Sequence, residues 1–352
     1  MAYTIGIDLT FIKDDKKAVG NEISALSIVE GIYKNAGKND FIIFACEKNA
    51  EQLKEKYPLF NIVSTKSGRR FYKKFLPWYL KNNKIDIIYY PQYSKLLNFK
   101  LKAKIVMTSH GIIRRDDFLI SDKLLKYIMK RVNKIIAVSD FVKRELTEKK
   151  GFDPEKIYVI PNPLAYMDEI RDLVYKKKHI VAVGNDQPQK NIMLIVKAFE
   201  KLVDKIEHDL VLIGDISQKG EIYRYLVDTG LSDRVVVTGK VGRDTLFGYY
   251  KNTDLFVNAS RYEGFGLAPL EAMVYQVPVL STPVPSISEI GNVSFDGNLT
   301  FDSNEQEIAD KMLALLNSQK DLESLKRRSE GILDYFSLDS IGKKYIQVFE
   351  NV

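Results

Sequence analysis

The sequence predicts an α/β protein made of two doubly wound halves, each with a parallel sheet between layers of helices. Short runs of β-branched residues alternate with stretches of helical periodicity, which is typical of successive βαβ units. The alternation stops at Pro161 and starts again at His179. The chain has 352 residues, whereas one ordinary domain has about 150. Two domains are therefore expected.

Each half contains a series of runs that we expect to form strands. In the first half these are residues 3–7, 41–45, 85–90, 104–108, 134–138 and 156–160. In the second half they are residues 179–183, 209–213, 234–237, 254–257 and 277–280. Runs of this kind, rich in Val and Ile and bounded by polar stretches, are typical of strands buried in a parallel sheet.

A linker is predicted between the halves. Pro161 and Pro163 close the last strand of the first half, and the polar stretch up to Lys178 is weakly patterned. We expect an N-terminal Rossmann-like domain over residues 1–163 and a C-terminal one over residues 164–334. The tail is patterned as a helix that either packs back on the first domain, which we favour, or caps the second. Its apolar residues within 335–352 are Phe336, Ile341, Tyr345, Val348 and Phe349.

The composition is that of a globular protein in a reducing compartment. Hydrophobic residues make up 45% and charged residues 28% of the chain. The single cysteine, Cys46, has no partner for an internal disulfide, which favours a cytoplasmic location. No run of about 18 apolar residues is present, and the first residues lack the pattern of an export signal. We therefore expect no membrane-spanning segment.

Charge is distributed unevenly. The net charge is +7. Residues 1–170 hold 31 basic and 20 acidic residues, and the remainder holds 22 and 26, which gives +11 and −4. Eleven basic residues and one acidic residue lie between Lys66 and Lys104. A basic surface of this kind could bind nucleic acid, anionic lipid or an acidic acceptor. A helix face that is simply exposed to solvent would explain the basic residues equally well.

The most informative motif is SRYEGFGLAPLEAM, which follows the strand run DLFV. Gly264 and Gly266 would let the backbone approach a ligand closely, and Pro269 suits the first turn of a helix. Glu263 then lies on the loop and Glu271 about one turn into the helix. Carboxylates accept hydrogen bonds from vicinal hydroxyls, so a sugar or a ribose is the expected ligand. Two unrelated surface glutamates are the alternative.

A second motif, HIVAVGNDQPQKNIM, predicts an anion site. Gly184 ends a strand, and Asn191 is expected to cap the helix that follows. Lys190 then lies at a helix N-terminus, and a lysine combined with a helix dipole can bind a diphosphate. The motif is not a P-loop, because the second glycine and the Lys-Ser/Thr ending are absent. An isolated solvated lysine is the alternative.

These two motifs, together with VSDF through Leu146 and VIPNP at 159–163, resemble glycosyltransferase family 4 in order and spacing. The resemblance covers nearly the whole chain. It implies a GT-B fold, with two Rossmann-like domains facing each other across a cleft. It also implies a nucleotide-sugar donor held mainly by the second domain, retention of configuration at the anomeric carbon, and no metal or other cofactor. The absence of any Asp-x-Asp motif agrees with a metal-independent enzyme.

The resemblance also assigns roles to individual residues. Lys190 would bind the donor diphosphate, Glu263 would contact the donor sugar, and Glu271 would hold the ribose. The backbone near Val241 would meet the base. The remaining donor-binding residues expected in this half are Asn185, Gly264, Phe265, Gly266 and Leu267.

Two elements of the first half complete the expected site. Gly20, in the sequence AVGNE, resembles the family's glycine loop over the diphosphate, although many members have two adjacent glycines. His110 ends the strand run KIVMT, where the family places a histidine near the reacting carbon. We therefore expect His110, Lys190 and Glu263 to form the catalytic set. A purely structural histidine is the alternative.

The sequence departs from the family pattern at two places. Many members have an arginine after the glycine that ends the strand, and this chain has Asn185. The later glycine pair is replaced by Pro285 and Ser286, ahead of Glu289. The sequence therefore does not identify the donor sugar or the group that substitutes for the arginine.

The function expected from all this is hexosyl transfer to a glycan in the synthesis of cell-surface polysaccharide or glycoconjugate. A nucleotide-sugar epimerase and a sugar-phosphate synthase are alternatives with the same fold. A protein that binds nucleic acid or an anionic surface is the alternative from another class. The stretch GRRFYKKFLPWYLK at 68–81 interleaves basic and aromatic residues, which suggests peripheral docking on the inner face of the cell membrane and a lipid-linked acceptor. A helix that simply buries its aromatic face is the other interpretation.

Overall fold

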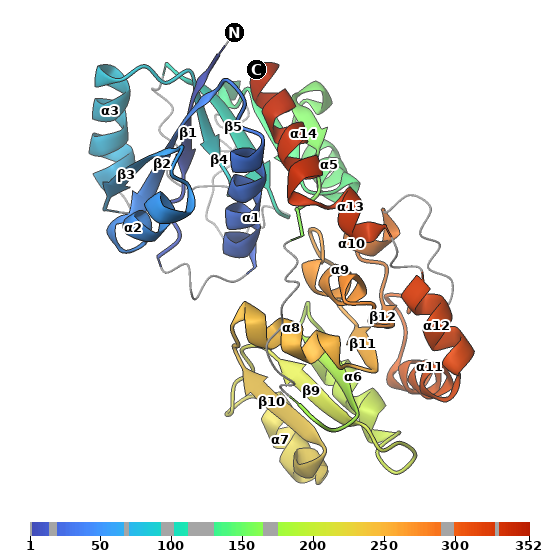
Figure 1. Ribbon diagram of the computed structural model, residues 1–352. Helices are drawn as coiled ribbons and strands as arrows, with labels where there is room; N and C mark the ends of the chain where they lie inside the picture. Colours follow the sequence, from blue (N-terminus) through green and yellow to red (C-terminus); the bar gives the residue numbers. More distant parts are fainter. Residues whose placement is uncertain are drawn as a thin grey trace. The chain divides into compact units, whose positions relative to one another are not determined.

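The computed structural model describes the chain as two compact units (Figure 1). The first comprises Met1–Ala165 and Asp334–Val352, and the second comprises Tyr166–Leu333. The residues that the structure describes are 2–13, 20–66, 70–92, 102–111, 130–164, 175–289, 299–327 and 331–352.

The first unit is built on a parallel sheet with the strand order β3-β2-β1-β4-β5-β6-β7. The strands are β1 (Thr4–Asp8), β2 (Asp40–Cys46), β3 (Asn61–Thr65), β4 (Ile87–Tyr90), β5 (Lys104–Ser109), β6 (Lys134–Ala137) and β7 (Ile157–Val159). The helices are α1 (Asn21–Lys34), α2 (Glu47–Lys56), η2 (Phe71–Phe75), α3 (Leu76–Asn82), α5 (Asp140–Arg144), η3 (Glu145–Lys149), η4 (Pro154–Lys156) and α14 (Leu338–Glu350).

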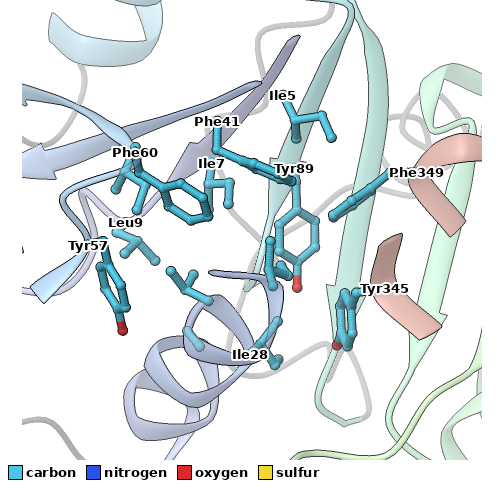
Figure 2. Packing of buried hydrophobic residues seen from close by; sticks show 14 of the residues in the cluster. Ile5, Ile7, Leu9, Ile28, Phe41, Tyr57, Phe60, Tyr89, Tyr345 and Phe349 are labelled. Atoms are coloured by element: carbon cyan, nitrogen blue, oxygen red, sulfur yellow. The ribbon is translucent and has the colours of Figure 1, made fainter. Parts of the chain in front are cut away.

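Helices cover both faces of this sheet because its strands are apolar on both sides. Figure 2 shows that Ile28 of α1 and Ile5 and Ile7 of β1 belong to one cluster, on the face of the sheet that α14 also covers. Phe44 of β2 belongs to the opposite face, where its ring contacts that of Phe71 on η2 with the centroids 5.5 Å apart. The first unit is therefore doubly wound.

The C-terminal helix α14 packs against α1 in the first unit. The rings of Tyr345 and Phe349 lie 5.8 and 5.2 Å from the ring of Tyr89 on β4 (Figure 2). The two helices meet at Gly31 and Gly342, where a Cβ on Gly342 would lie 2.0 Å from the Gly31 carbonyl oxygen. Only glycine allows the backbones to approach this closely.

The second unit has a parallel sheet with the order β10-β9-β8-β11-β12. Its strands are β8 (His179–Val183), β9 (Asp209–Ile213), β10 (Val235–Gly239), β11 (Leu255–Asn258) and β12 (Val279–Ser281). Its helices are α6 (Ile192–Glu200), α7 (Glu221–Asp228), η5 (Leu231–Asp233), α8 (Arg243–Lys251), α9 (Leu267–Val274), α10 (Pro285–Ser288), α11 (Glu305–Asn317) and α12 (Gln319–Arg327). The short helix α13 (Ile332–Tyr335) leads back to the first unit.

The predicted fold class is confirmed, and every run expected to form a strand contains one. The strand β3 was not predicted. It lies at the edge of its sheet and is only partly buried, so its sequence NIVST needs few apolar residues. In the described residues, no helix has the length and apolarity needed to cross a bilayer.

Candidate functional site

Three strands of the second unit end on closely packed glycines. The Gly184 N–H donates to the Ile213 carbonyl at 2.9 Å, and the Gly214 N–H donates to the Gly239 carbonyl at 3.0 Å. A Cβ on Gly214 would lie only 1.8 Å from the Gly184 carbonyl oxygen. At these three positions the carboxyl edge of the sheet, which we call the glycine edge, presents backbone without side chains. Open α/β sheets bind ligands at the carboxyl ends of their strands. Gly214 was not predicted, although a glycine directly after the run DLVLI was the available signal.

Lys190 lies on the loop between β8 and α6, as expected. The Asn185 side-chain oxygen accepts the Gln187 N–H at 3.2 Å, so this side chain shapes the loop. The capping role predicted for the Asn191 side chain is wrong. Asn191 has φ 53° and makes no side-chain hydrogen bond at the helix end. Its backbone is left-handed, which asparagine tolerates better than most residues, and its carbonyl accepts the Leu194 N–H instead.

The two predicted motifs meet at an ion pair. Lys190 Nζ lies 2.6 Å from Glu263 Oε1, and the two side chains are 29% and 12% exposed. The Arg261 N–H also donates to the Gln189 carbonyl at 2.9 Å, which ties the two loops together through their backbones. A cation and a carboxylate separated by 73 residues in sequence are thus held together at the glycine edge.

The loop that carries Glu263 is held by the stretch that departs from the family pattern. Ser286 Oγ donates to the Gly266 carbonyl at 2.5 Å, and the Ser286 N–H donates to the Phe265 carbonyl at 2.7 Å. Gly266 has φ 90°, and a Cβ there would lie 2.9 Å from Val284 Cγ2. Ser286 was not predicted as a site residue. Its hydrogen bonds fix the loop just before Leu267 begins α9.

Glu271 lies in α9 and is only 9% exposed. Burial raises the pKa of its carboxyl group, and the nearby charge of Arg243 opposes that rise. Arg243 Nη2 lies 3.6 Å from Glu271 Oε1. In the part of the chain that the structure describes, no hydrogen bond reaches this carboxylate. Arg243 was missed because only the fold brings the side chain at the start of α8 to within 3.6 Å of Glu271 on α9.

The segment expected near the base follows β10. Lys240 Nζ pairs with Asp215 Oδ2 at 2.9 Å, and both side chains are largely exposed. Val241 is partly exposed and lies between β10 and the start of α8. Its backbone is therefore close in sequence to both Gly239 and Arg243.

Gly20 and His110 belong to the first unit. Gly20 has a positive φ of 50°, which side chains other than hydrogen disfavour, and precedes α1. Residues 18 and 19 of the predicted glycine loop lie outside the described residues. His110 follows β5, and its Nε2 donates to the Pro91 carbonyl at 2.8 Å. Burial lowers the pKa of His110 to about 4, so the ring is neutral near pH 7. Within the described chain, its buried Nδ1 has no hydrogen-bond partner.

The first unit also contains a buried carboxyl group that was not predicted. Asp8 ends β1 and is 2% exposed, and burial raises its pKa. It accepts hydrogen bonds from the backbone and hydroxyl of Thr10 and, at 2.7 Å, from the Tyr72 hydroxyl. Tyr72 belongs to the stretch of basic and aromatic residues at 68–81, which we call the basic aromatic segment. This hydrogen bond ties Tyr72 to the carboxyl edge of the sheet.

Metal ligands are not grouped in the described residues, where no three His, Cys, Asp or Glu side chains form a set that could hold an ion. The charged groups at the glycine edge of the second unit include two ion pairs that hold predicted site residues, Lys190 with Glu263 and Arg243 with Glu271. Such a site offers a cation to an anionic ligand and carboxylates to hydroxyl groups.

Comparisons with known proteins agree with this arrangement. The family model for "Glycosyl transferases group 1" matches residues 168–331, and the model for "Glycosyltransferase Family 4" matches residues 35–165. The chain is 26% identical over 267 residues to the N-acetyl-alpha-D-glucosaminyl L-malate synthase of Bacillus anthracis, over 71% of this chain and 68% of that protein. It is 32% identical over 168 residues to the O-antigen chain mannosyltransferase RfbU of Salmonella typhimurium, over 47% of each.

The fold is shared with solved glycosyltransferase structures. Anabaena HepE, crystallised with UDP and glucose, matches with a TM-score of 0.77 and 16% identity, over 99% of this chain and 100% of that one. WaaG, a glycosyltransferase of lipopolysaccharide biosynthesis, matches with a TM-score of 0.71 and 14% identity, over 98% and 99%. A different glycosyltransferase model thus matches most of each unit: the chain consists of a glycosyltransferase family 4 domain followed by a glycosyl transferases group 1 domain, and it has the GT-B fold.

Proposed function

We propose that the protein is a retaining glycosyltransferase that moves a hexose from a nucleotide-diphosphate sugar to a glycan acceptor. The observation that carries this proposal is the pairing of Lys190 with Glu263 beside the glycine edge of the second unit. One cation is available for a diphosphate, and one carboxylate held next to it is available for the hydroxyls of the attached sugar. Glu271, buried and without a hydrogen bond in the described chain, has unfilled acceptors for a ribose.

Catalysis would then depend on positioning and electrostatics. Lys190 stabilises the charge that develops on the leaving diphosphate, the preorganised kind of stabilisation that often dominates catalysis. Glu263 orients the donor sugar, and the bare backbone at Gly184 and Gly214 lets the donor approach. The neutral ring of His110 is assigned to the vicinity of the reacting carbon, and Gly20 to the diphosphate. We assign no covalent nucleophile, so retention implies attack from the face of the leaving group. No metal is assigned a role.

The names of the relatives support a role in polysaccharide or glycoconjugate synthesis, since RfbU acts on O-antigen chains and WaaG in lipopolysaccharide biosynthesis. HepE binds UDP and glucose, so UDP is the first nucleotide to test. A sugar-phosphate synthase is the second candidate, because the "Probable sucrose-phosphate synthase" of Thermosipho melanesiensis is 27% identical over 207 residues. That function would require a small soluble acceptor.

The basic aromatic segment supports docking on an anionic membrane and a lipid-linked acceptor. Phe71 is buried, so part of the aromatic face is used by the core of the first unit. Trp78, in contrast, is 59% exposed, and Lys73 and Lys74 are exposed on the same short stretch. An exposed indole beside lysines is the chemistry of a segment at the lipid headgroup level. Arg69 and Gly68 of this stretch lie outside the described residues.

The test combines binding with transfer. Purified protein is screened against UDP, GDP, ADP and dTDP by thermal shift, since a ligand that binds only the folded state raises the melting temperature. The matching nucleotide sugars are then assayed for transfer to glycan acceptors, and the anomeric configuration of the product is determined by NMR. A product of inverted configuration would exclude retention. No stabilisation by any nucleotide would contradict the donor site itself and favour a protein that binds an anionic surface.

A further inference from the structure

Arg243 lies beside the buried carboxylate of Glu271. It is the first residue of α8, and its Nη2 lies 3.6 Å from Glu271 Oε1 on α9. The distance is that of an ion pair and is longer than a hydrogen bond. The guanidinium carbon also lies 4.8 Å from the ring centre of Phe247, one helical turn further along α8. Phe247 is fully buried, so its ring is a fixed support for the guanidinium.

A second titratable group that interacts with Glu271, Tyr250, offers no positive charge. Tyr250 of α8 is fully buried, and its hydroxyl has no hydrogen-bond partner in the described chain. The pKa of Tyr250 is raised well above its usual value, first by burial and then by the charge of Glu271. Tyr250 is therefore protonated and neutral, and Arg243 is the one cation acting on Glu271 among the described residues.

We infer that Arg243 is a positioning residue of the donor site, which keeps Glu271 ionised and oriented so that the ribose hydroxyls complete its hydrogen bonds. The inference rests on the proposed role of Glu271 in holding the ribose. A buried carboxylate that loses its nearby cation takes up a proton more readily. A protonated carboxyl group accepts fewer hydrogen bonds from two vicinal hydroxyls than a carboxylate does. Arg243 thus acts on the ribose through Glu271 and needs no contact with the nucleotide.

The pH dependence follows from the direction of the pKa shift. Burial raises the pKa of Glu271 above its ordinary value, and Arg243 limits that rise. If the ionised form binds the ribose, affinity falls as the pH drops through this pKa. Removal of the guanidinium raises the pKa of Glu271 further. The loss of affinity then begins at a higher pH.

The experiment compares UDP with its 2′,3′-dideoxy form, which lacks both ribose hydroxyls. Dissociation constants are measured by calorimetry from pH 5 to pH 8 for wild type, Arg243→Gln and Arg243→Lys. For Arg243→Gln at pH 7, we expect UDP to bind about tenfold more weakly, the scale of a hydrogen bond to a charged group, and dideoxy-UDP to bind as before. The pH at which half of the UDP affinity is lost should be higher in Arg243→Gln than in wild type. Arg243→Lys keeps the positive charge, so it should retain most of the UDP affinity and a pH midpoint close to that of wild type.

Each outcome separates this inference from the proposed function. Equal weakening of UDP and dideoxy-UDP would mean that Arg243 contacts the phosphates or supports the fold, and would overturn the inference. An unchanged pH profile in Arg243→Gln would do the same. Should that variant not fold, Arg243→Lys is compared with Glu271→Gln, in which the ratio of the UDP and dideoxy-UDP dissociation constants should be near one and should not change with pH. If wild type binds none of UDP, GDP, ADP and dTDP, the proposed function fails as well.

Discussion

The substitution Glu263→Gln separates nucleotide binding from transfer. In the structure, Lys190 Nζ lies 2.6 Å from Glu263 Oε1 in a pair that is mostly but not fully buried. A diphosphate that takes Lys190 must therefore compete with a carboxylate already bound to it. Glutamine has nearly the same shape as glutamate but no charge, so the substitution frees the lysine without leaving a cavity.

The size of the effect follows from the exposure of the pair. Two unit charges about 4 Å apart near a protein surface interact by roughly 4 kcal/mol before desolvation is subtracted. Exposed pairs are worth about 0–1 kcal/mol in practice. Lys190 is 29% exposed, so we expect a net gain near 1 kcal/mol, or about fivefold tighter binding of UDP. Transfer should fall by about ten- to a hundredfold, because the donor sugar loses a charged hydrogen bond.

The assay is calorimetric titration of UDP together with initial rates of transfer from the UDP-sugar. Lys190→Ala should weaken UDP binding by roughly 1.5–3 kcal/mol. In the double variant, Glu263→Gln should no longer tighten binding, because there is no lysine to release. Glu207→Gln is the matched control, since this carboxylate is 82% exposed and adjoins the opposite, amino-terminal end of β9. Weaker UDP binding by Glu263→Gln, or equal tightening by the control, would refute the reasoning.

Three further predictions follow from the structure. Gly214→Ala should lower the unfolding free energy by about 3 kcal/mol or more, measured by denaturant titration, because its Cβ would overlap a carbonyl oxygen at 1.8 Å. Gly230→Ala, where the space is open, should cost about 1 kcal/mol, and equal losses would contradict the packing argument. Transfer should survive excess EDTA, and a loss restored by magnesium or manganese would show that a metal is required. Wild type should co-sediment with anionic liposomes at low salt but not at high salt. Replacement of Lys73 and Lys74 by Ser together with Trp78→Ala should reduce the recovery severalfold, and equal recovery would exclude docking by this segment.

The positions of Lys190 and Glu263 could be predicted because the sequence shows where the preceding strands end. Lys190 and Glu263 each follow a run of apolar residues that had to form a strand of one parallel sheet. The carboxyl ends of neighbouring parallel strands share an edge, and β8 and β11 are indeed neighbours. The proximity of the two side chains therefore follows from local patterns and one rule of topology. The resemblance to a family added their roles, which remain proposals.

The remaining features depend on packing that leaves no local trace in the sequence. Arg243 of α8 meets Glu271 of α9 through the fold, 28 residues away in sequence, and Tyr72 reaches Asp8 across 64 residues of sequence. The backbone of Asn191 is left-handed, so its side chain does not act as the predicted cap. The preference of asparagine for helix N-termini favoured a hydrogen bond from its side chain, but the loop holds Asn191 in a left-handed conformation in which this bond is not formed.

The two acid–base pairs have a consequence for how the site recognises its donor. The charges of Lys190 and Glu263 cancel, so a diphosphate that binds Lys190 replaces the carboxylate that the lysine already contacts, whereas Arg243 and Glu271 stay paired. When a diphosphate takes Lys190, Glu263 loses its partner at 2.6 Å and becomes a partly buried carboxylate without a hydrogen-bond donor from Lys190. The hydroxyls of the attached sugar can supply them. Under the proposed function, the diphosphate and the sugar of one donor therefore favour each other's binding. A free sugar would have to displace Lys190, and a bare nucleoside diphosphate would leave Glu263 unsatisfied, which is why the intact nucleotide sugar is the ligand that completes the site.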